Sequence, residues 1–206
     1  MAKLVGADCR NCRREGCKLF LKGERCVSKK CAFERRPVIP GQHGASRKRV
    51  TQYGTQLREK QKVKKAYGIL EKQFRKYYEE AERMKGVTGE NMLSLIERRL
   101  DNVVYRMGIG SSRKETRQIV NHCQITVNGR TVKTPSFLVK AGDIVAVKEN
   151  KKELEQFKQL KGMKIVMPKW LEFNTEALSG KVLALPTRED IDLNIKEHLI
   201  VELYSR

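Results

Sequence analysis

The sequence from Leu93 to Val147, LSLIERRLDNVVYRMGIGSSRKETRQIVNHCQITVNGRTVKTPSFLVKAGDIVAV, decides the fold. Apolar residues in its first part recur at steps of three and four, a spacing that predicts one helix with a buried face. These residues are Leu93, Ile96, Leu100, Val103, Val104 and Met107. Gly108 and Gly110 then predict the end of this helix, because glycine readily adopts the backbone conformation that follows a helix end.

A second helix is predicted directly after Ser112. Ser112 and Glu115 have the spacing of a capping box, in which each side chain accepts a hydrogen bond from the other residue's backbone N–H. The apolar stripe of this helix consists of Thr116, Ile119, Val120 and Cys123. Its cations, on a different side, are Arg113, Lys114 and Arg117. For any one of these cations, a solvated surface position is the alternative to a binding role.

A small sheet follows. Asn128-Gly129 lies between two β-rich runs and predicts a hairpin, because both turn positions of such a hairpin need positive φ. The hairpin strands are 125–127 and 130–132, and Gly142-Asp143 introduces another strand at 144–147. The stretch therefore predicts a compact α+β unit of two helices and a small sheet, with one cationic helix face.

The charge of the chain points to a polyanionic partner. The 206 residues carry a net charge of +20, and residues 1–50 alone hold 14 Lys and Arg against 4 Asp and Glu. Such a charge opposes compaction unless a polyanion neutralises it, and nucleic acid is the partner that phosphate neutralisation favours. No apolar run approaches the ~20 residues of a membrane span, and no secretory leader is present. A cytoplasmic protein in a reducing compartment is therefore expected.

Five of the six cysteines crowd into the N-terminal segment, where they are interpreted as metal ligands before disulfides. Cys9 and Cys12 form one pair and Cys26 and Cys31 a second, a spacing that lets four thiolates bind one structural Zn²⁺. Cys17 belongs to neither pair and has the weakest claim. Zinc would staple a segment that has few large apolar residues. The alternative is a cluster of free or redox-active thiols.

Between the cysteines and Leu93, residues 34–52 predict an irregular segment that contains the basic run Arg47-Lys48-Arg49. Residues 53–67 predict a basic helix. A second helix follows, and its apolar stripe consists of Leu70, Phe74, Tyr77, Ala81 and Met84. Tyr78 lies off this stripe and is the candidate for stacking on a base.

The last third of the chain gives weaker patterns. Residues 149–161 predict a polar helix with an apolar edge at Leu154, Phe157 and Leu160, and residues 162–190 predict loops with short strands. Residues 199–204 (LIVELY) predict a buried strand that rejoins an earlier domain. No phosphate-cradling Gly-rich loop and no Gly-x-Ser-x-Gly turn is present, which favours a binding protein over an enzyme.

RLDNVVYRMG (99–108), SSRKETRQIVNH (111–122) and ITVNG (125–129) strongly resemble the RNA-binding module named after bacterial small-subunit ribosomal protein four. The resemblance extends through PGQHG (40–44), LREKQKVKKAYGI (57–69), QFRKYYEEA (73–81) and EHLIVELYSR (197–206), and so covers nearly the whole chain. The module also occurs in pseudouridine synthases, a tRNA synthetase and a heat-shock RNA binder. The flanking motifs are typical of the ribosomal protein family.

The resemblance implies three parts: a zinc-binding basic N-terminal segment (1–44), a helical domain (45–95) and the RNA-binding module (96–180). A C-terminal segment at about 181–206 would join the helical domain. The resemblance also implies the zinc-binding, four-Cys type of the family, with one structural Zn²⁺ per chain. Its ligands by position are Cys9, Cys12, Cys26 and Cys31. Other members lack these cysteines, so zinc is not expected to be essential for binding rRNA.

The implied function is that of a non-enzymatic constituent of the small (30S) ribosomal subunit. Such a protein binds 16S rRNA early, nucleates assembly of the body of the subunit and contributes to translational accuracy. The implied partners are small-subunit protein five, other 30S proteins and mRNA near its path into the ribosome, with no membrane and no small-molecule substrate. The residues predicted to bind RNA are Arg10, Arg13, Arg14, Arg47, Lys48, Arg49, Arg58, Lys62, Lys65, Arg113, Lys114, Arg117, Asn128 and Arg130.

Two functions of other classes stay open. An rRNA- or tRNA-modifying enzyme that uses the module as an anchor would need an additional catalytic domain. A zinc-dependent DNA-binding regulator would need a recognition helix within the cysteine segment.

Overall fold

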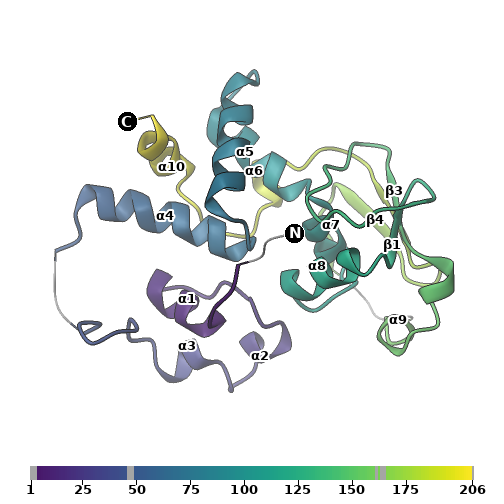
Figure 1. Ribbon diagram of the computed structural model, residues 1–206, viewed down its shortest axis with the longest axis horizontal. Helices are drawn as coiled ribbons and strands as arrows, with labels where there is room; N and C mark the ends of the chain where they lie inside the picture. The colour runs from purple at the N-terminus through teal and green to yellow at the C-terminus, as the bar shows by residue number, and fades with distance from the viewer. Residues whose placement is uncertain (1–3, 46–48, 161, 163–165, 206) are drawn as a thin grey trace. The chain divides into compact units, whose positions relative to one another are not determined.

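The computed structural model describes residues 4–45, 49–160, 162 and 166–205 (Figure 1). The chain divides into two compact units. The first contains Met1–Met92 and Leu193–Arg206, and the second contains Leu93–Asp192. The predicted segment 1–44 and most of the predicted segment 45–95 lie in the first unit, together with the end of the chain from residue 193.

The first unit is helical. Its elements are α1 (Asp8–Glu15), α2 (Glu24–Val27), α3 (Ala32–Arg35), α4 (Gln52–Ala66), α5 (Glu71–Arg83), the start of α6 (Thr88–Glu97) and α10 (Glu197–Tyr204). Thr51 caps α4, because its side-chain oxygen accepts a hydrogen bond from the Gly54 N–H at 3.1 Å. In α5, Phe74, Tyr77 and Ala81 are buried as predicted. Leu70 and Met84 are exposed, since they flank the helix instead of belonging to it.

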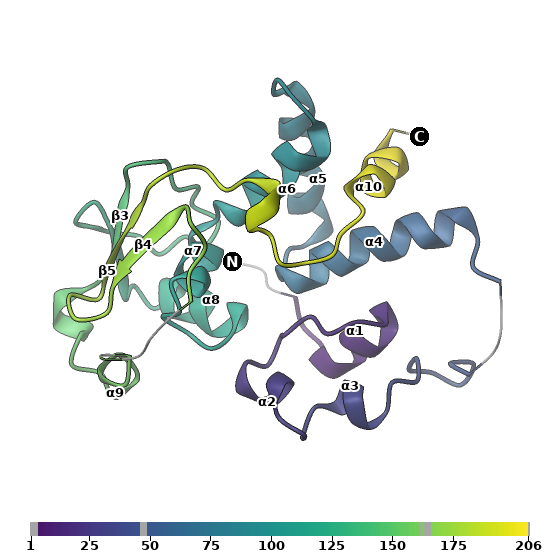
Figure 2. The ribbon, with the colours of Figure 1, turned by 180° about the vertical axis from the view of Figure 1, so that it is seen from behind.

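The C-terminal helix α10 corrects the strand predicted at 199–204. It packs along α4 (Figure 2), and the Gln52 amide of α4 donates to Glu202 of α10 at 3.1 Å. The Tyr204 ring stacks on Tyr78 of α5 at 4.8 Å between centroids. A helix places Ile200 and Tyr204, four residues apart, on one face toward these helices.

Two helices replace the single helix predicted from Leu93 to Met107. Helix α6 ends at Glu97 and α7 spans Leu100–Arg106. Between them Arg99 is extended and bridges Leu138, and the Leu100 N–H donates to the Phe137 carbonyl at 2.8 Å. Hydrogen bonds to a distant segment thus replace those of a continuous helix. The burial prediction is confirmed, since all six apolar residues of the pattern are buried.

The second unit combines helices with a five-stranded sheet, which confirms the α+β class. The strands are β1 (Ile125–Val127), β2 (Arg130–Thr131), β3 (Ile144–Val147), β4 (Leu171–Asn174) and β5 (Ser179–Val182), in the order β2-β1-β3-β5-β4 with every pair antiparallel. The predicted hairpin is confirmed, and Asn128 and Gly129 have φ of 49° and 77°. Helices α7 and α8 (Arg113–Asn121) share one core with the sheet (Figure 1).

Two local predictions in this unit are wrong. The polar helix predicted at 149–161 is a 3₁₀ turn, η1 (Glu149–Lys151), followed by one helical turn, α9 (Glu155–Lys158). Phe157 is buried in the core, whereas Leu154 is exposed; Lys161 lies outside the described residues. Cys123 follows α8 with φ of 57° and is partly exposed, so it does not extend the apolar stripe of the helix.

A second 3₁₀ turn, η2, spans Arg188–Asp190. None of the described helices has the length and apolar character needed to span a bilayer.

Candidate nucleic-acid interface

Two of the three predicted cations of α8 are held in place by α7. Arg113 Nε donates to Asn102 Oδ1 at 2.8 Å, and the Arg113 guanidinium lies 4.4 Å from the centre of the Tyr105 ring. Arg117 Nη1 donates to Asp101 Oδ2 at 2.9 Å. Lys114 is exposed. Both arginines are therefore positioned by partners in α7, and the three cations have different surroundings.

A buried charge network lies behind this face. The Asp101 carboxylate accepts hydrogen bonds from Arg99 Nε at 3.0 Å and from Arg99 Nη2 at 2.7 Å, in addition to the one from Arg117. The side chains of Arg99 and Asp101 are 3% and 6% exposed. Two guanidinium groups thus share one buried carboxylate, and this arrangement fixes the orientation of α8 on α7.

The N-terminus of α8 is capped in a modified form of the predicted box. Ser112 accepts a hydrogen bond from the Glu115 N–H at 3.3 Å, as expected. The Glu115 carboxylate accepts from the N–H and the hydroxyl of Ser111, both at 2.7 Å, instead of from the Ser112 N–H. Glu115 pairs with Ser111 because Ser111 offers two donors to the same carboxylate oxygen. The cap is confirmed, and its reciprocal half is one residue out of place.

On the hairpin, Asn128 joins the turn to β3. Its amide nitrogen donates to Asp143 at 2.9 Å, and its amide oxygen accepts from the Ile144 N–H at 2.9 Å. These bonds give Asn128 a structural task besides the predicted RNA contact. Arg130 is exposed, as are Lys133 and Lys140, which were not among the residues predicted to bind RNA. In the sequence, Lys133 directly follows the second predicted hairpin strand, and Lys140 stands two residues before Gly142-Asp143.

Two predicted cations of α4 share a carboxylate of α1. The Glu15 side chain is fully buried, and its Oε1 accepts from Arg58 at 3.1 Å and from Lys65 at 2.6 Å. Lys62 pairs with Glu59 at 2.6 Å, and only 16% of its side chain is exposed. The sequence indicated the excess of cations on this helix but could not indicate which of them have acidic partners.

In the N-terminal segment the structure adds cations to the predicted set. Of the predicted residues, Arg10 and Arg49 are exposed, Arg13 is half-buried, and Arg14 donates to the Pro40 carbonyl at 2.9 Å. Arg47 and Lys48 lie outside the described residues. Exposed cations on and beside α2 and α3, not predicted to bind RNA, are Lys22, Arg25, Lys29, Lys30, Arg35 and Arg36. The sequence feature that could have predicted these cations is the density of basic residues around Cys26 and Cys31.

Tyr78 is not available for stacking on a base, contrary to the prediction. It is 5% exposed and stacks on Tyr204, whose hydroxyl donates to Glu71 at 2.8 Å. Burial and this hydrogen bond to Glu71 raise the pKa of Tyr204. The sequence placed Tyr78 off the stripe because it gave no sign that α10 covers this side of α5.

Three of the four cysteines predicted to bind zinc are buried. Cys12, Cys26 and Cys31 are buried, and Cys9 is partly exposed. Burial raises the pKa of the Cys12 thiol, the Leu19 N–H lowers it, and the neighbouring thiols of Cys26 and Cys9 raise it further. Crowded buried thiols of this kind would be stabilised as thiolates by a bound cation. Among the described side chains, however, no three potential ligands already stand in a metal-binding arrangement.

Comparisons with known proteins cover the whole chain. The family model described as "Ribosomal protein S4/S9 N-terminal domain" matches residues 3–97, and the model described as "S4 domain" matches residues 98–145. Similar relatives include proteins of Caldicellulosiruptor bescii (62% identical), Clostridioides difficile (60%) and Ruminiclostridium cellulolyticum (59%). Each is described as small ribosomal subunit protein uS4, and each alignment covers 100% of both chains.

Proposed function

The chain belongs to the family of small ribosomal subunit protein uS4, and from this premise we propose that it holds 16S rRNA with several separate groups of cations. It is a structural constituent of the small subunit, and its family consists of structural proteins, not enzymes. The observation that carries this conclusion is the identity of about 60% over the full length of both chains.

The proposed mechanism is electrostatic and depends on shape. Lys and Arg side chains neutralise phosphates and release counterions, and folded RNA is recognised by the arrangement of such contacts more than by any one of them. The pairing of Arg113 with Asn102 and of Arg117 with Asp101 supports this proposal, because positioned cations match one arrangement of phosphates better than mobile ones do. Exposed cations beside α2, α3 and the β1–β2 hairpin would supply further groups.

The proposal extends to the role in the subunit. By holding rRNA helices in a fixed relative orientation early, the chain nucleates assembly of the body of the 30S subunit and contributes to translational accuracy. Its protein partners are small-subunit protein five and other 30S proteins, and its basic N-terminal part lies near the path of mRNA into the ribosome. Support comes from family membership and from cations in both units of the chain.

The direct test is association with the small subunit. The tagged chain should sediment with small subunits in high salt, and the purified chain should protect a discrete region of a 16S rRNA transcript from chemical probing. A test variant has Lys29, Lys30, Arg35 and Arg36 replaced by Gln. It should bind the same region of the transcript as the wild-type chain, but more weakly. Recovery of the wild-type chain only as free protein would refute the function.

We propose separately that Cys9, Cys12, Cys26 and Cys31 hold one structural Zn²⁺. Burial of Cys12, Cys26 and Cys31 supports this set, as do the thiols of Cys26 and Cys9, which raise the pKa of Cys12; the thiol of Cys17 raises it as well. When bound, the ion would cross-link the N-terminal segment without taking part in a reaction. Metal analysis should find one zinc per chain. Cys31→Ser should abolish it and Cys17→Ser should retain it; loss of metal on the Cys17 change would show that the ligand set is wrong.

A further inference from the structure

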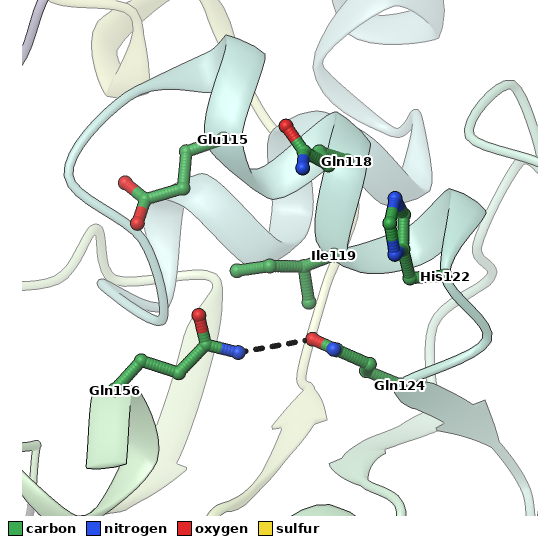
Figure 3. Close-up of a pocket in the computed structure, with 6 residues that line it drawn as sticks. All are labelled: Glu115, Gln118, Ile119, His122, Gln124 and Gln156. Atoms are coloured by element: carbon green, nitrogen blue, oxygen red, sulfur yellow. Dashed lines mark hydrogen bonds between the residues drawn. The ribbon is translucent and has the colours of Figure 1, made fainter. Parts of the chain in front are cut away.

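A polar cavity of about 240 Å³ lies in the second unit, beside helix α8 (Figure 3). Its lining consists of Glu115, Gln118, Ile119, His122, Gln124 and Gln156. Four of these residues, at positions 115, 118, 119 and 122, follow the i, i+3, i+4, i+7 spacing of a single helix face. Gln124 directly precedes β1 and Gln156 belongs to α9, so residues from three parts of the unit build the cavity.

The walls of the cavity present amides on both sides. Gln156 Nε2 donates to Gln124 Oε1 at 3.1 Å and closes one end. Figure 3 shows Ile119 in the middle of the cavity, with Glu115 and Gln156 on one side of it and His122 and Gln124 on the other. Ile119 is 4% exposed and forms an apolar floor. Gln118 and His122 are exposed at the rim.

We propose that this cavity binds one unstacked base of the RNA that the chain holds, so that α8 recognises a base as well as phosphates. This inference rests on the proposed binding of rRNA. Sequence-specific recognition of RNA uses unpaired bases, which are hydrogen-bonded along their edges and stacked on flat side chains. The side chains here match that chemistry in three respects.

The first respect is hydrogen bonding. Each side-chain amide carries a donor and an acceptor, and a base edge is also a mixture of the two. The bond from Gln156 to Gln124 uses one group of each and leaves the Gln124 nitrogen and the Gln156 oxygen to face a ligand. Ser111 engages Oε2 of Glu115, which leaves Oε1 as an acceptor for an exocyclic amino group.

The second respect is charge. Among the described residues that line the cavity none is Lys or Arg, and the Glu115 carboxylate would repel a phosphate, so these residues favour a neutral occupant. Lys114, which is exposed, precedes Gln118 by one turn on α8. A nucleotide could therefore place its base in the cavity while its phosphate lies toward the cationic part of the same helix.

The third respect is size and shape. A volume of about 240 Å³ is smaller than the roughly 300–1,000 Å³ of pockets for drug-sized ligands, so one planar heterocycle fits better than a dinucleotide. Ile119 offers an apolar contact for one face of a ring, and the imidazole of His122 offers a flat one. Together these features select a base against a phosphate and against a longer stretch of RNA.

The test uses the full-length chain and a 16S rRNA transcript. The pocket variant carries Gln118→Ala and Gln156→Ala. The matched control carries Asn121→Ala and Gln159→Ala, two exposed amides at the ends of the same two helices and outside the cavity lining. A second pocket variant, His122→Ala, removes only the ring. Because these side chains are exposed, all variants should unfold at the wild-type denaturant midpoint.

The pocket variant should bind the transcript about tenfold more weakly, because base-edge hydrogen bonds are lost. The slope of log affinity against log salt should stay unchanged, because no phosphate contact is removed. Chemical probing of base edges should find one base that the wild-type and control chains protect and both pocket variants leave reactive.

Three results would overturn the inference. They are wild-type affinity with an unchanged footprint, a lower affinity with a reduced salt slope, and normal RNA binding with weaker incorporation into subunits, which would indicate a protein occupant. If the wild-type chain itself does not bind the transcript, the proposed function fails, and this inference fails with it.

Discussion

The buried carboxylate of Asp101 offers the sharpest test of how the second unit is held together. It accepts three hydrogen bonds from two arginines, Arg99 and Arg117, at 2.7 to 3.0 Å. Asp101→Asn keeps the size of the side chain but removes its charge. One acceptor oxygen also becomes an NH₂ group that points at a guanidinium. Arg99, 3% exposed, then loses the negative charge of its buried carboxylate partner.

The magnitude follows from the burial of the partners. Removing one member of a buried pair costs about 3–5 kcal/mol, because the other charge stays desolvated. The Arg117 side chain is 14% exposed and can regain some water, which favours the lower end of this range. We expect a loss of about 3 kcal/mol in the free energy of unfolding. With a urea dependence of about 2 kcal/mol per molar, the midpoint should fall by about 1.5 M.

Trp170 makes this loss measurable in the second unit alone. It is the one tryptophan of the chain, is 3% exposed and belongs to the core of that unit. Its fluorescence should therefore follow unfolding of the second unit during a urea titration. Glu176→Gln, a change of an exposed carboxylate in the same unit, is the control and should alter stability by less than about 0.5 kcal/mol. A midpoint for Asp101→Asn within about 0.3 M of wild type would refute the reasoning.

Three further predictions concern the cations and the first unit. Lys114→Ala should reduce the salt slope of rRNA binding by about one phosphate equivalent without changing stability. Replacing Arg113, Lys114 and Arg117 together should reduce the slope by about three equivalents and should also destabilise the second unit, because Asp101 loses its bond from Arg117. An unchanged slope for both variants would mean that this face does not touch RNA. Burial raises the pKa of Glu71, but hydrogen bonds from Lys60, Lys64 and Tyr204 outweigh it and lower the pKa to about 2 from an ordinary 4.5. Because the folded pKa is depressed, Glu71 stabilises the fold above about pH 4.5, and this contribution is lost as the pH falls toward 2. Solvent screening reduces the contribution to about 1 kcal/mol, since 44% of the side chain is exposed. When thermal unfolding is compared at pH 5 and pH 3, Glu71→Gln should therefore lose less stability than wild type. Tyr204→Phe should destabilise the first unit by about 1 kcal/mol through loss of the bond to Glu71, as followed by helical circular dichroism, and an unchanged melting temperature would contradict that role.

Local sequence signals predicted the parts of the fold that depend on local chemistry. The Asn128-Gly129 hairpin follows from the need for positive φ at two adjacent residues, and the helix after Ser112 follows from its cap. The buried residues before Gly108 were also predicted correctly, since burial depends on spacing. These signals act over a few residues and need no knowledge of the rest of the chain.

Predictions failed where a distant segment decides the outcome. The break at Arg99 is stabilised by backbone partners at 135–139, about 40 residues away, which no helical spacing could reveal. Residues 199–204 form a short, mostly apolar run that predicted a buried strand, yet their partners are the helices α4 and α5, so the helical form buries Ile200 and stacks Tyr204. Tyr78 was misplaced for the same reason. In the candidate interface, the sequence indicated which residues carry positive charge but not which of them pair with acidic side chains.

Pairing of a cation with an acid does not remove it from RNA binding, and the stoichiometry of the pairs shows why. Asp101 pairs with Arg99 and Arg117, Glu15 with Arg58 and Lys65, and Glu71 with Lys60 and Lys64. In each case two cations share one carboxylate, so the three side chains together carry one net positive charge while the carboxylate fixes both cations. Fixed side chains lose less conformational entropy when they bind a phosphate. A large net charge can therefore be held at defined positions in the folded chain, and this arrangement suits a protein whose partner is a folded polyanion.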